Sequence, residues 1–534
     1  MPITRRRFLQ SAAAGAATLL TPAFLAACGG AASPAAAPSA TPATPATPAG
    51  SPTPAAKRGP SKGTITVAEN ILPAALDTNV GAGGLALMAY GVGETLMRVS
   101  PDMKIEPWIA STVEQVSARQ WRVVLRDDVT FSDGSVCDAA AVKASFELSM
   151  EKAPSVATFL PKGTTFTANG RTLEITTPTD VALMRSNLAA FNLIVQKPAA
   201  GGGMLFTGPF VPSGLVPQSA LTLTAYAGYR GGPARLERIS VRYVPDVNAR
   251  VLALQSGDVH AAAALLPSHA ALLKSAGLEV HNFKFTRSNQ IVLNVKRAPL
   301  DDVAVRRAIA LAVDREAIVK NVLDGSARVS KAFVPDDIGL TGIVDTQKTD
   351  VAEAKRILDA AGWTVGTGGV RSKGGKALSF KLGFYDSRAE LEPMTVVIKD
   401  RLKAVGIDAV IEKFADINTT VANSAFDATL YSYNPVPYAD PGRGITQFYV
   451  ASGTNKDRYA NPAVTEAFEQ YKQAAEAGAR NALLEKMQRT FGQDVPVVYV
   501  LNPNQIHAFS KKVKGYTPHP LENYKYHADL SVDA

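Results

Sequence analysis

Cysteine, histidine and long apolar runs are scarce in this sequence of 534 residues, and each scarcity excludes a class of protein. The two cysteines are Cys28 and Cys137, and the six histidines lack the H-E-x-x-H spacing or any other grouping that is typical of metal sites. After the first thirty residues, no stretch supplies the roughly 18 apolar residues that a membrane-spanning helix needs. We therefore expect no metal, no cofactor and no spanning helix.

Motifs of catalysis and nucleotide binding are missing as well. The sequence has no G-x-S-x-G elbow, no Walker A loop and no G-x-G-x-x-G turn after a strand. The net charge is +9, but basic and acidic residues are interspersed and form no basic stripe, so no nucleic-acid partner is expected. We predict that the protein has no catalytic residues and is not an enzyme, with an exported enzyme as the remote alternative.

The composition is that of a folded protein with more than one lobe. Hydrophobic residues make up 46% of the chain and charged residues 19%, which is typical of globular domains. A chain of 534 residues is longer than a single core usually supports. Two or more lobes are expected.

The chain opens with basic residues followed by a short apolar stretch. Arg5-Arg6-Arg7-Phe8-Leu9 precedes a run that ends in Leu25-Ala26-Ala27-Cys28. The arginines resemble the twin-arginine (Tat) export signal, and Leu-Ala-Ala-Cys is similar to the lipobox in which the cysteine receives lipid. We predict a signal peptide over residues 1–27, lipidation of Cys28 and an extracytoplasmic location on the cell membrane. The general secretory route stays open as the alternative to Tat.

A linker is predicted over residues 28–62, because this stretch consists almost wholly of Ala, Pro, Thr, Ser and Gly. Such a composition cannot bury a core and forms an extended tether. With Cys28 lipidated, Cys137 has no partner for a disulfide, and we interpret it as a small buried residue rather than a reactive thiol.

The remaining chain alternates strand and helix patterns. Aspartates precede several helical patterns as N-caps: Asp138, Asp301 or Asp302, and Asp314. Residues 379–433 read as strand, helix, strand and a later strand, which favours parallel pairing. Further strands are predicted at 64–67, 121–126, 290–295 and 497–501, and helices at 463–477 and 479–491. The fold class is α/β.

Several separated blocks of sequence resemble one family in the same order along the chain. They are Glu94-Thr95-Leu96-Met97-Arg98, Arg126-Asp127-Asp128-Val129-Thr130-Phe131-Ser132-Asp133-Gly134, Thr207-Gly208-Pro209-Phe210, Ala253-Leu254-Gln255-Ser256-Gly257-Asp258-Val259, Asp314-Arg315-Glu316-Ala317-Ile318 and Ala361-Gly362-Trp363. The pattern resembles family 5 of the extracellular solute-binding proteins, the dipeptide, oligopeptide and nickel-type receptors of bacterial ABC importers.

The resemblance implies a two-lobed periplasmic-binding-protein fold of class II (cluster C), with an extra small domain inserted in lobe I. Lobe I would be built from residues 64–97, 205–289 and 505–534, the extra domain from 98–204, and lobe II from 290–504. Two crossover segments would join the lobes, and the ligand would be enclosed between them when they close.

The ligand motif departs from the family pattern. Peptide-binding members carry an Arg and an Asp for the charged peptide termini. Aligned on Asp440-Pro441, this sequence has Tyr431 in place of the Arg and Pro437 in place of the Asp. Nickel-binding members recruit a His near here, and none occurs from 441 to 459. The predicted ligand-binding residues are Tyr431, Tyr433, Asn434, Tyr438, Asp440 and Arg443, for which packing of the strand end and a solvated turn are the structural alternatives.

The resemblance therefore implies a substrate-binding lipoprotein of an ABC importer. It would be a monomer that binds a small polar solute, such as an oligopeptide, a peptide derivative or a carbohydrate, and delivers it to permease and ATPase subunits. The same closed lobes would also serve a ligand sensor or a chaperone that has no permease.

Overall fold

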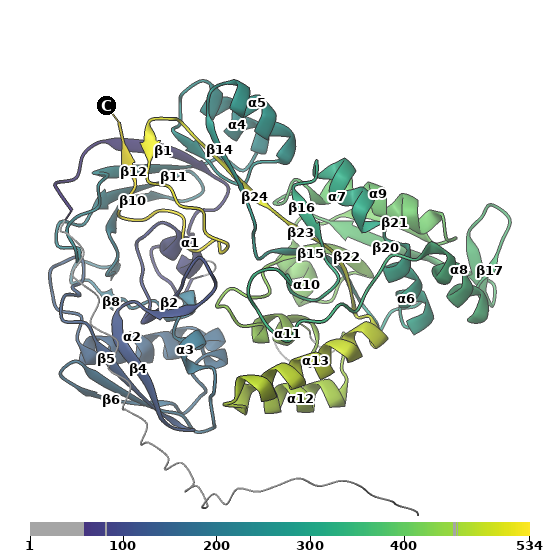
Figure 1. Ribbon diagram of the computed structural model, residues 1–534, viewed down its shortest axis with the longest axis horizontal. Helices are drawn as coiled ribbons and strands as arrows, with labels where there is room; N and C mark the ends of the chain where they lie inside the picture. Colours follow the sequence, from purple (N-terminus) through teal and green to yellow (C-terminus); the bar gives the residue numbers. More distant parts are fainter. Residues whose placement is uncertain (1–57, 81–82, 452–454, 456–457, 534) are drawn as a thin grey trace, which may run out of the picture. The chain divides into compact units, whose positions relative to one another are not determined.

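The structure is a computed structural model that describes residues 58–80, 83–451, 455 and 458–533, all within one compact unit, Ala55–Ala534. The predicted signal peptide, Cys28 and most of the predicted linker lie outside the described residues. The described part is a mixed α/β fold, as the strand and helix patterns predict (Figure 1).

One large sheet has seven strands in the described part of the chain. Its central strand β1 pairs in parallel with β12 and β13, and β24 runs antiparallel to both β13 and β14. In spatial order the strands are β10 (Phe210–Val216), β11 (Ala220–Ala225), β12 (Arg238–Tyr243), β1 (Thr64–Glu69), β13 (Ala261–Ala262), β24 (Gln505–Phe509) and β14 (Glu279–Phe283).

A second large sheet has six strands. Strand β20 runs parallel to β21 and β22, and helix α9 (Leu391–Lys403) connects β20 to β21, which confirms the predicted β-α-β succession. In spatial order the strands are β16 (Ala327–Val329), β23 (Val497–Pro503), β15 (Ser288–Leu293), β22 (Ala428–Tyr433), β20 (Ser379–Phe384) and β21 (Asp408–Lys413).

A smaller antiparallel sheet is packed against helix α2 (Ala139–Lys152), with Trp121, Val123 and Leu125 of β5 buried in alternation as expected for a half-buried strand. Its order is β4 (Ala110–Ser117), β5 (Gln120–Leu125), β7 (Thr172–Thr176) and β6 (Thr165–Asn169). Short ladders are formed by β2 (Met97–Val99), β3 (Ile105–Pro107), β8 (Lys197–Pro198), β9 (Met204–Leu205), β17 (Thr364–Val365), β18 (Arg371–Lys373), β19 (Lys376–Ala377), β25 (Val513–Lys514) and β26 (Ser531–Val532).

Aspartate side chains cap the helices for which caps were predicted. Asp138, Asp302 and Asp314 each accept a hydrogen bond from a backbone N–H in the first turn of α2, α6 or α7. The helices whose bounds are not given above are α1 (Gly83–Ala89), α3 (Met184–Asn187), α4 (Val247–Gln255), α5 (Pro267–Ser275), α6 (Val303–Ala312), α7 (Arg315–Val322), α8 (Val351–Ala360), α10 (Ile417–Ala422), α11 (Gly442–Phe448), α12 (Pro462–Gln473) and α13 (Ala477–Asp494), with short 3-10 turns η1 (Pro154–Thr158) and η2 (Phe191–Leu193).

Several predicted boundaries differ by a few residues from those of the structure, and β15 and α12 show why. Strand β15 begins at Ser288 rather than at residue 290, because Ser288 and Asn289 pair with the end of β22. Helix α12 ends at Gln473, before the predicted end at 477. The guanidinium of Arg480 binds the carbonyl oxygens of Ala474 and Ala475 and so satisfies the backbone of the turn that follows.

The chain passes twice between the two large sheets. One crossover is the segment 284–287 between β14 and β15, and the other is Asn504 between β23 and β24 (Figure 1). Residues at these crossovers therefore lie next to both sheets.

Cys137 is buried, and burial raises the pKa of its thiol to about 12, in agreement with the prediction of an unreactive residue. Among the described residues, no helix combines the length and the apolar character that crossing a membrane requires.

Candidate functional site

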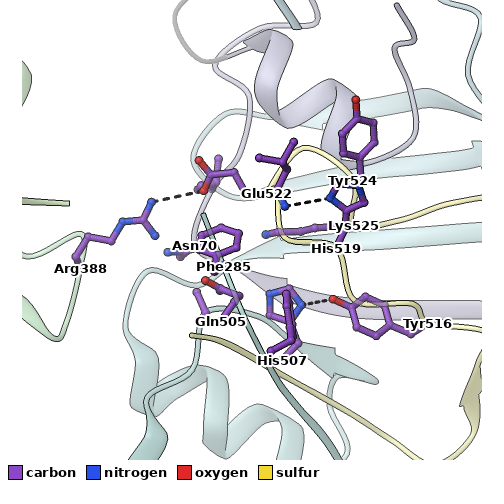
Figure 2. Close-up of a pocket in the computed structure, with 14 residues that line it drawn as sticks. Asn70, Phe285, Arg388, Gln505, His507, Tyr516, His519, Glu522, Tyr524 and Lys525 are labelled. Atoms are coloured by element: carbon purple, nitrogen blue, oxygen red, sulfur yellow. Dashed lines mark hydrogen bonds and ion pairs between the residues drawn. The ribbon is translucent and has the colours of Figure 1, made fainter. Parts of the chain in front are cut away.

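Two adjoining cavities lie where the crossovers join the sheets, with about 360 Å³ and 660 Å³ of free space including the part open to solvent. Asn70, Ala264, Arg388 and Gln505 line both. Asn70 follows β1 and Gln505 begins β24 of the seven-stranded sheet, whereas Arg388 lies just after β20 of the six-stranded sheet (Figure 2). Both sheets therefore contribute walls to one polar site.

A buried ion pair connects the first crossover to the C-terminal segment. Both oxygens of Glu522 accept hydrogen bonds from Arg287 Nη2 at 2.7 Å, and Arg287 Nη1 donates to the carbonyl oxygen of Ser432 at 3.1 Å. Burial raises the pKa of Glu522, but the charges of Arg287 and Arg388 outweigh it and lower this pKa to about 2. Glu522 therefore stays ionised and its charge is matched by Arg287.

Arg388 is a second guanidinium near Glu522. Because the charge of Glu522 is already balanced by Arg287, the positive charge of Arg388 has no carboxylate of its own. Its Nη2 lies 3.8 Å from Glu522 Oε2, and its side chain is 17% exposed. Its guanidinium has this ion-pair contact with Glu522 and no hydrogen bond to a described residue. Burial and the neighbouring charge of Arg287 lower the pKa of Arg388. At the junction of the two cavities, a guanidinium thus has its donors available.

Lys525 and Glu69 form a second matched pair on the wall of the smaller cavity. Lys525 Nζ donates to Glu69 Oε2 at 2.7 Å, and the hydroxyl of Tyr526 donates to Oε1 at 2.6 Å. This carboxylate is buried and satisfied. The pair adds no net charge to the cavity.

Arg250 lines the larger cavity but is used by the backbone. Its guanidinium donates to four carbonyl oxygens, those of Val244, Pro245, Ala263 and Ala264, at 2.7–3.0 Å. It holds the loop after β13 in place. Because these partners are neutral, its charge also adds to the positive balance of the site.

A neutral histidine completes the smaller cavity. His507 Nδ1 lies 2.6 Å from the hydroxyl of Tyr516, and His507 Nε2 has no hydrogen-bond partner among the described residues (Figure 2). Burial, together with the charge of Lys525, keeps the pKa of His507 well below its usual value. The unpaired nitrogen can bind one polar group of a ligand.

The predicted tyrosines lie at and after the end of β22. Tyr431 is partly exposed, and Tyr433 and Tyr438 are buried. The hydroxyl of Tyr438 donates to Asn192 Oδ1 at 3.1 Å. Asn434 Oδ1 accepts from the backbone N–H of Val436 at 3.2 Å, a local turn contact.

Arg443 joins these tyrosines, whereas Asp440 does not. Arg443 Nη1 donates to the Tyr438 hydroxyl at 3.0 Å, and its guanidinium lies 5.9 Å from the ring centre of Tyr433. Asp440 accepts hydrogen bonds from the Tyr471 hydroxyl and from the Gly442 N–H, both at 2.7 Å, and burial raises its pKa. Asp440 therefore contacts α12 rather than Arg443.

None of the six predicted ligand-binding side chains lines either of the two cavities formed by the described residues, and their role in binding stays a prediction. The cavity-lining residues Arg287, Arg388, Glu522 and Lys525 were not predicted from the sequence. One signal was present for Arg388: it follows the predicted strand 379–385, and ligands of parallel sheets bind beyond the carboxyl ends of the strands. The others lie in irregular segments without a motif.

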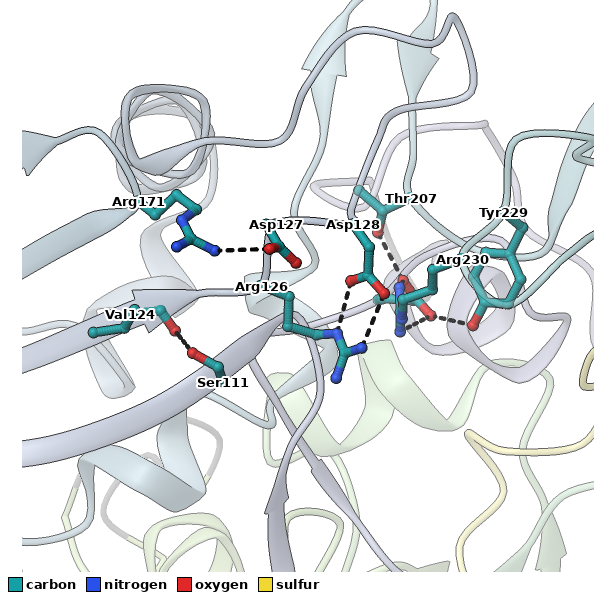
Figure 3. A network of polar contacts seen from close by, with 10 residues as sticks. Ser111, Val124, Arg126, Asp127, Asp128, Arg171, Thr207, Tyr229 and Arg230 are labelled. Atoms are coloured by element: carbon teal, nitrogen blue, oxygen red, sulfur yellow. Dashed lines mark hydrogen bonds and ion pairs between the residues drawn. The ribbon is translucent and has the colours of Figure 1, made fainter. Parts of the chain in front are cut away.

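A separate network of buried charge includes Thr207, Tyr229 and Arg230 (Figure 3), none of which lines either cavity. Glu94 is fully buried and accepts hydrogen bonds from both terminal nitrogens of Arg230 at 2.6 and 2.7 Å, from the Tyr229 hydroxyl at 2.9 Å and from Thr207 Oγ1 at 3.1 Å. All its partners are protein groups, so this network ties three chain segments together and has no capacity for a ligand.

Two large sheets connected by two crossovers, with a polar site between them, define the class of two-lobed solute receptors. The chain belongs to family 5 of the bacterial extracellular solute-binding proteins, because the profile of the family's middle region matches residues 104–456. This confirms the predicted family and the two-lobed α/β fold class.

Relatives agree with this assignment. The nickel-binding protein NikA of Staphylococcus aureus is 26% identical over 437 residues, which cover 80% of this chain and 87% of NikA. Its crystal structure with Ni(L-His)2 matches with a TM-score of 0.77 at 24% identity, covering 88% of this chain and all of that one. The oligopeptide-binding protein AppA of Bacillus subtilis, in complex with a nonapeptide, matches with a TM-score of 0.71 at 19% identity, covering 89% of this chain and all of AppA.

The protein is accordingly a substrate-binding component of the kind that serves ABC importers, as predicted. Members of this family are extracytoplasmic substrate-binding proteins of transporters and not enzymes.

Proposed function

We propose that this protein captures a small polar solute with an anionic group in the two adjoining cavities, binds that group through Arg388, and delivers the solute to permease and ATPase subunits. The observation that carries the proposal is the position of Arg388, which lines both cavities and whose guanidinium makes no hydrogen bond to any described residue. A guanidinium in this setting favours a carboxylate, which it can bind through two parallel hydrogen bonds.

The charge balance around the cavities supports an anionic rather than a cationic ligand. The pairs Arg287–Glu522 and Lys525–Glu69 are neutral, and Asp386 is paired with Lys413. Among the ionisable groups that remain, the charges of Arg388 and Arg250 exceed that of Glu390. A ligand carboxylate would remove the cost of leaving this excess charge in a partly desolvated site.

The ligands named for two relatives are compatible with this chemistry, since L-histidine and a nonapeptide both carry a carboxylate. The missing ionic anchors at Tyr431 and Pro437 argue against an ordinary peptide held by both termini at those positions. A peptide derivative or another amino acid conjugate therefore fits better than a neutral carbohydrate, and no step of this cycle requires catalysis.

A thermal-shift screen of the purified chain tests the proposal. The panel contains peptides, amino acid conjugates of the opine type, neutral oligosaccharides, and nickel with histidine. An anionic compound should raise the midpoint of the wild type by mass action. The shift should be lost in Arg388→Gln and retained in Arg356→Gln, a control at an exposed guanidinium on α8.

Two outcomes would contradict the proposal: a midpoint shift with neutral oligosaccharides alone, or a shift of equal size in wild type and Arg388→Gln. Turnover of any compound would contradict the claim that the protein is not an enzyme.

The anchoring and domain boundaries belong to the same proposal. We propose export of the chain as a lipoprotein anchored through Cys28, with lobe I at 64–97, 205–289 and 505–534, the extra domain at 98–204 and lobe II at 290–504. Cys28→Ala should move the protein from the membrane fraction to the soluble extracytoplasmic fraction. Unchanged membrane association of that variant would exclude a lipid anchor at Cys28.

A further inference from the structure

A further arginine, Arg443, lies near the aromatic rings around Tyr431 and lines neither of the two cavities. Tyr431 is partly exposed near the end of β22, and its ring lies 6.0 Å from that of Tyr385, 6.3 Å from that of Tyr433 and 6.0 Å from that of Phe448. These rings pack against Tyr431 and leave part of its phenol exposed.

Guanidinium groups approach these rings from separate elements. Arg287 reaches the carbonyl oxygen of Ser432, the residue after Tyr431, and Arg443 lies over the ring of Tyr433. Burial raises the pKa of Tyr431, and the charges of Arg287, Arg443, Arg458 and Arg388 each act to lower it. The ring of Tyr431 thus lies beside that of Tyr385, three residues before Arg388, and beside that of Tyr433, over which Arg443 lies.

Arg443 has no carboxylate partner among the described residues. Its contacts are the Tyr438 hydroxyl and the ring faces of Phe191, Tyr433 and Tyr438, at 5.8–6.0 Å from the ring centres. The nearest acid in the sequence, Asp440, is turned toward Tyr471. Ring faces and a hydroxyl stabilise a guanidinium only partly, and the charge is not neutralised.

We propose that the ligand carries two separated anionic groups, one bound by Arg388 and the other by Arg443, with its connecting part over Tyr431. This inference rests on the proposed function and narrows it from an anionic solute to a dianionic one. It also explains the departure from the peptide motif: a cation at 443 serves a second carboxylate, whereas an acid at 437 would serve an ammonium group.

The test uses α,ω-dicarboxylates from succinate to azelate, each compared with the monocarboxylate of equal carbon number. Isothermal titration calorimetry on the purified full chain gives the affinity ratio at every length. At the length that spans the two guanidiniums, the diacid should bind at least about tenfold more tightly than the monoacid, since charge-assisted hydrogen bonds are among the strong ones.

Arg443→Gln should abolish this advantage, Arg443→Lys should keep part of it, and Arg356→Gln should leave the binding of monoacids and diacids unchanged. Arg356→Gln is the matched control, and thermal melting of each variant shows that it is folded. The proposal is overturned if no diacid of any length binds more tightly than its monoacid, or if no diacid binds at all. It is also overturned if Arg443→Gln retains the wild-type ratio of diacid to monoacid affinity.

The two proposals fail in different ways. Loss of monoacid binding in Arg388→Gln supports the anchor, whatever the result at Arg443. Unchanged monoacid binding in Arg388→Gln contradicts the anchor, and the diacid ratio alone then decides the role of Arg443.

Discussion

Two clusters of buried charge in this protein differ in how completely the protein satisfies them. At Glu94, one carboxylate receives four hydrogen bonds from Arg230, Tyr229 and Thr207. At the crossovers, Glu522 is shared between Arg287 at 2.7 Å and Arg388 at 3.8 Å (Figure 2). In the first cluster the carboxylate is fully hydrogen-bonded by protein groups. In the second, the guanidinium of Arg388 lies at a cavity and makes no hydrogen bond to a described residue.

The difference separates a structural role from a binding role. A buried ion pair with every partner present stabilises one arrangement of the chain, and removing one member leaves an isolated charge. An arginine with unused donors contributes little to stability and keeps its hydrogen-bonding capacity for a ligand. Substitutions at the two clusters should therefore affect different quantities.

The largest effect is expected from Glu94→Ala. This variant leaves the charge of Arg230 in a buried site without a partner, and it should lower the free energy of unfolding by about 3–5 kcal/mol. Denaturant unfolding of the purified chain measures this. The control is Glu174→Ala, which removes the exposed Arg122–Glu174 pair and should change the same quantity by less than about 1 kcal/mol. If both variants lost the same free energy of unfolding, the buried Glu94 cluster would be no more important for stability than an exposed ion pair.

A somewhat smaller effect is expected from pH, through His519. Its Nε2 lies 3.1 Å from the Val99 carbonyl oxygen, and its Nδ1 accepts from the Leu521 N–H at 3.0 Å, so the neutral ring fits. Burial lowers its pKa from 6.5 to about 4. The unfolded chain therefore binds more protons between these values. The free energy of unfolding should therefore fall by about 3 kcal/mol as the pH is lowered from above 6.5 toward 4.

Unfolding of wild type and His519→Gln at pH 7 and near pH 4 measures this contribution. The loss between the two pH values should be smaller in the variant by about that amount. An unchanged loss in His519→Gln would assign the pH dependence to other groups, such as His507, whose pKa is also lowered by burial.

The smallest effect on stability is expected from Arg388→Gln. Because Arg287 repels this side chain and no described residue hydrogen-bonds to it, the free energy of unfolding should change by less than about 1 kcal/mol. Affinity for an anionic solute should fall at least about tenfold. Calorimetric titration and denaturant unfolding of the same preparation compare the two. A large loss of stability with unchanged affinity would place Arg388 with Glu94 as a structural residue.

Local sequence signals predicted the elements of the fold well. The caps Asp138, Asp302 and Asp314 and the parallel strands around 379–433 follow from side-chain hydrogen bonding and from hydrophobic patterns, which act over short distances. The end of α12 was missed because it depends on Arg480 binding the turn, a contact that no local pattern shows.

The candidate site was harder to predict, because its residues are brought together by the topology. Arg287 and Glu522 are 235 positions apart and meet only because a crossover and the C-terminal segment lie side by side. The resemblance drew attention to residues 431–443, where Tyr433, Tyr438 and Arg443 do form one cluster. It carried no information on Arg388, for which the signal in the sequence was its position after the predicted strand 379–385.

The most direct test of the account is a crystal structure of this chain with the anionic solute found by the thermal-shift screen. An anionic group of that solute should lie within hydrogen-bond distance, about 3 Å, of the Arg388 guanidinium at the junction of the two cavities. A solute bound between the lobes without any contact to Arg388 would contradict this account.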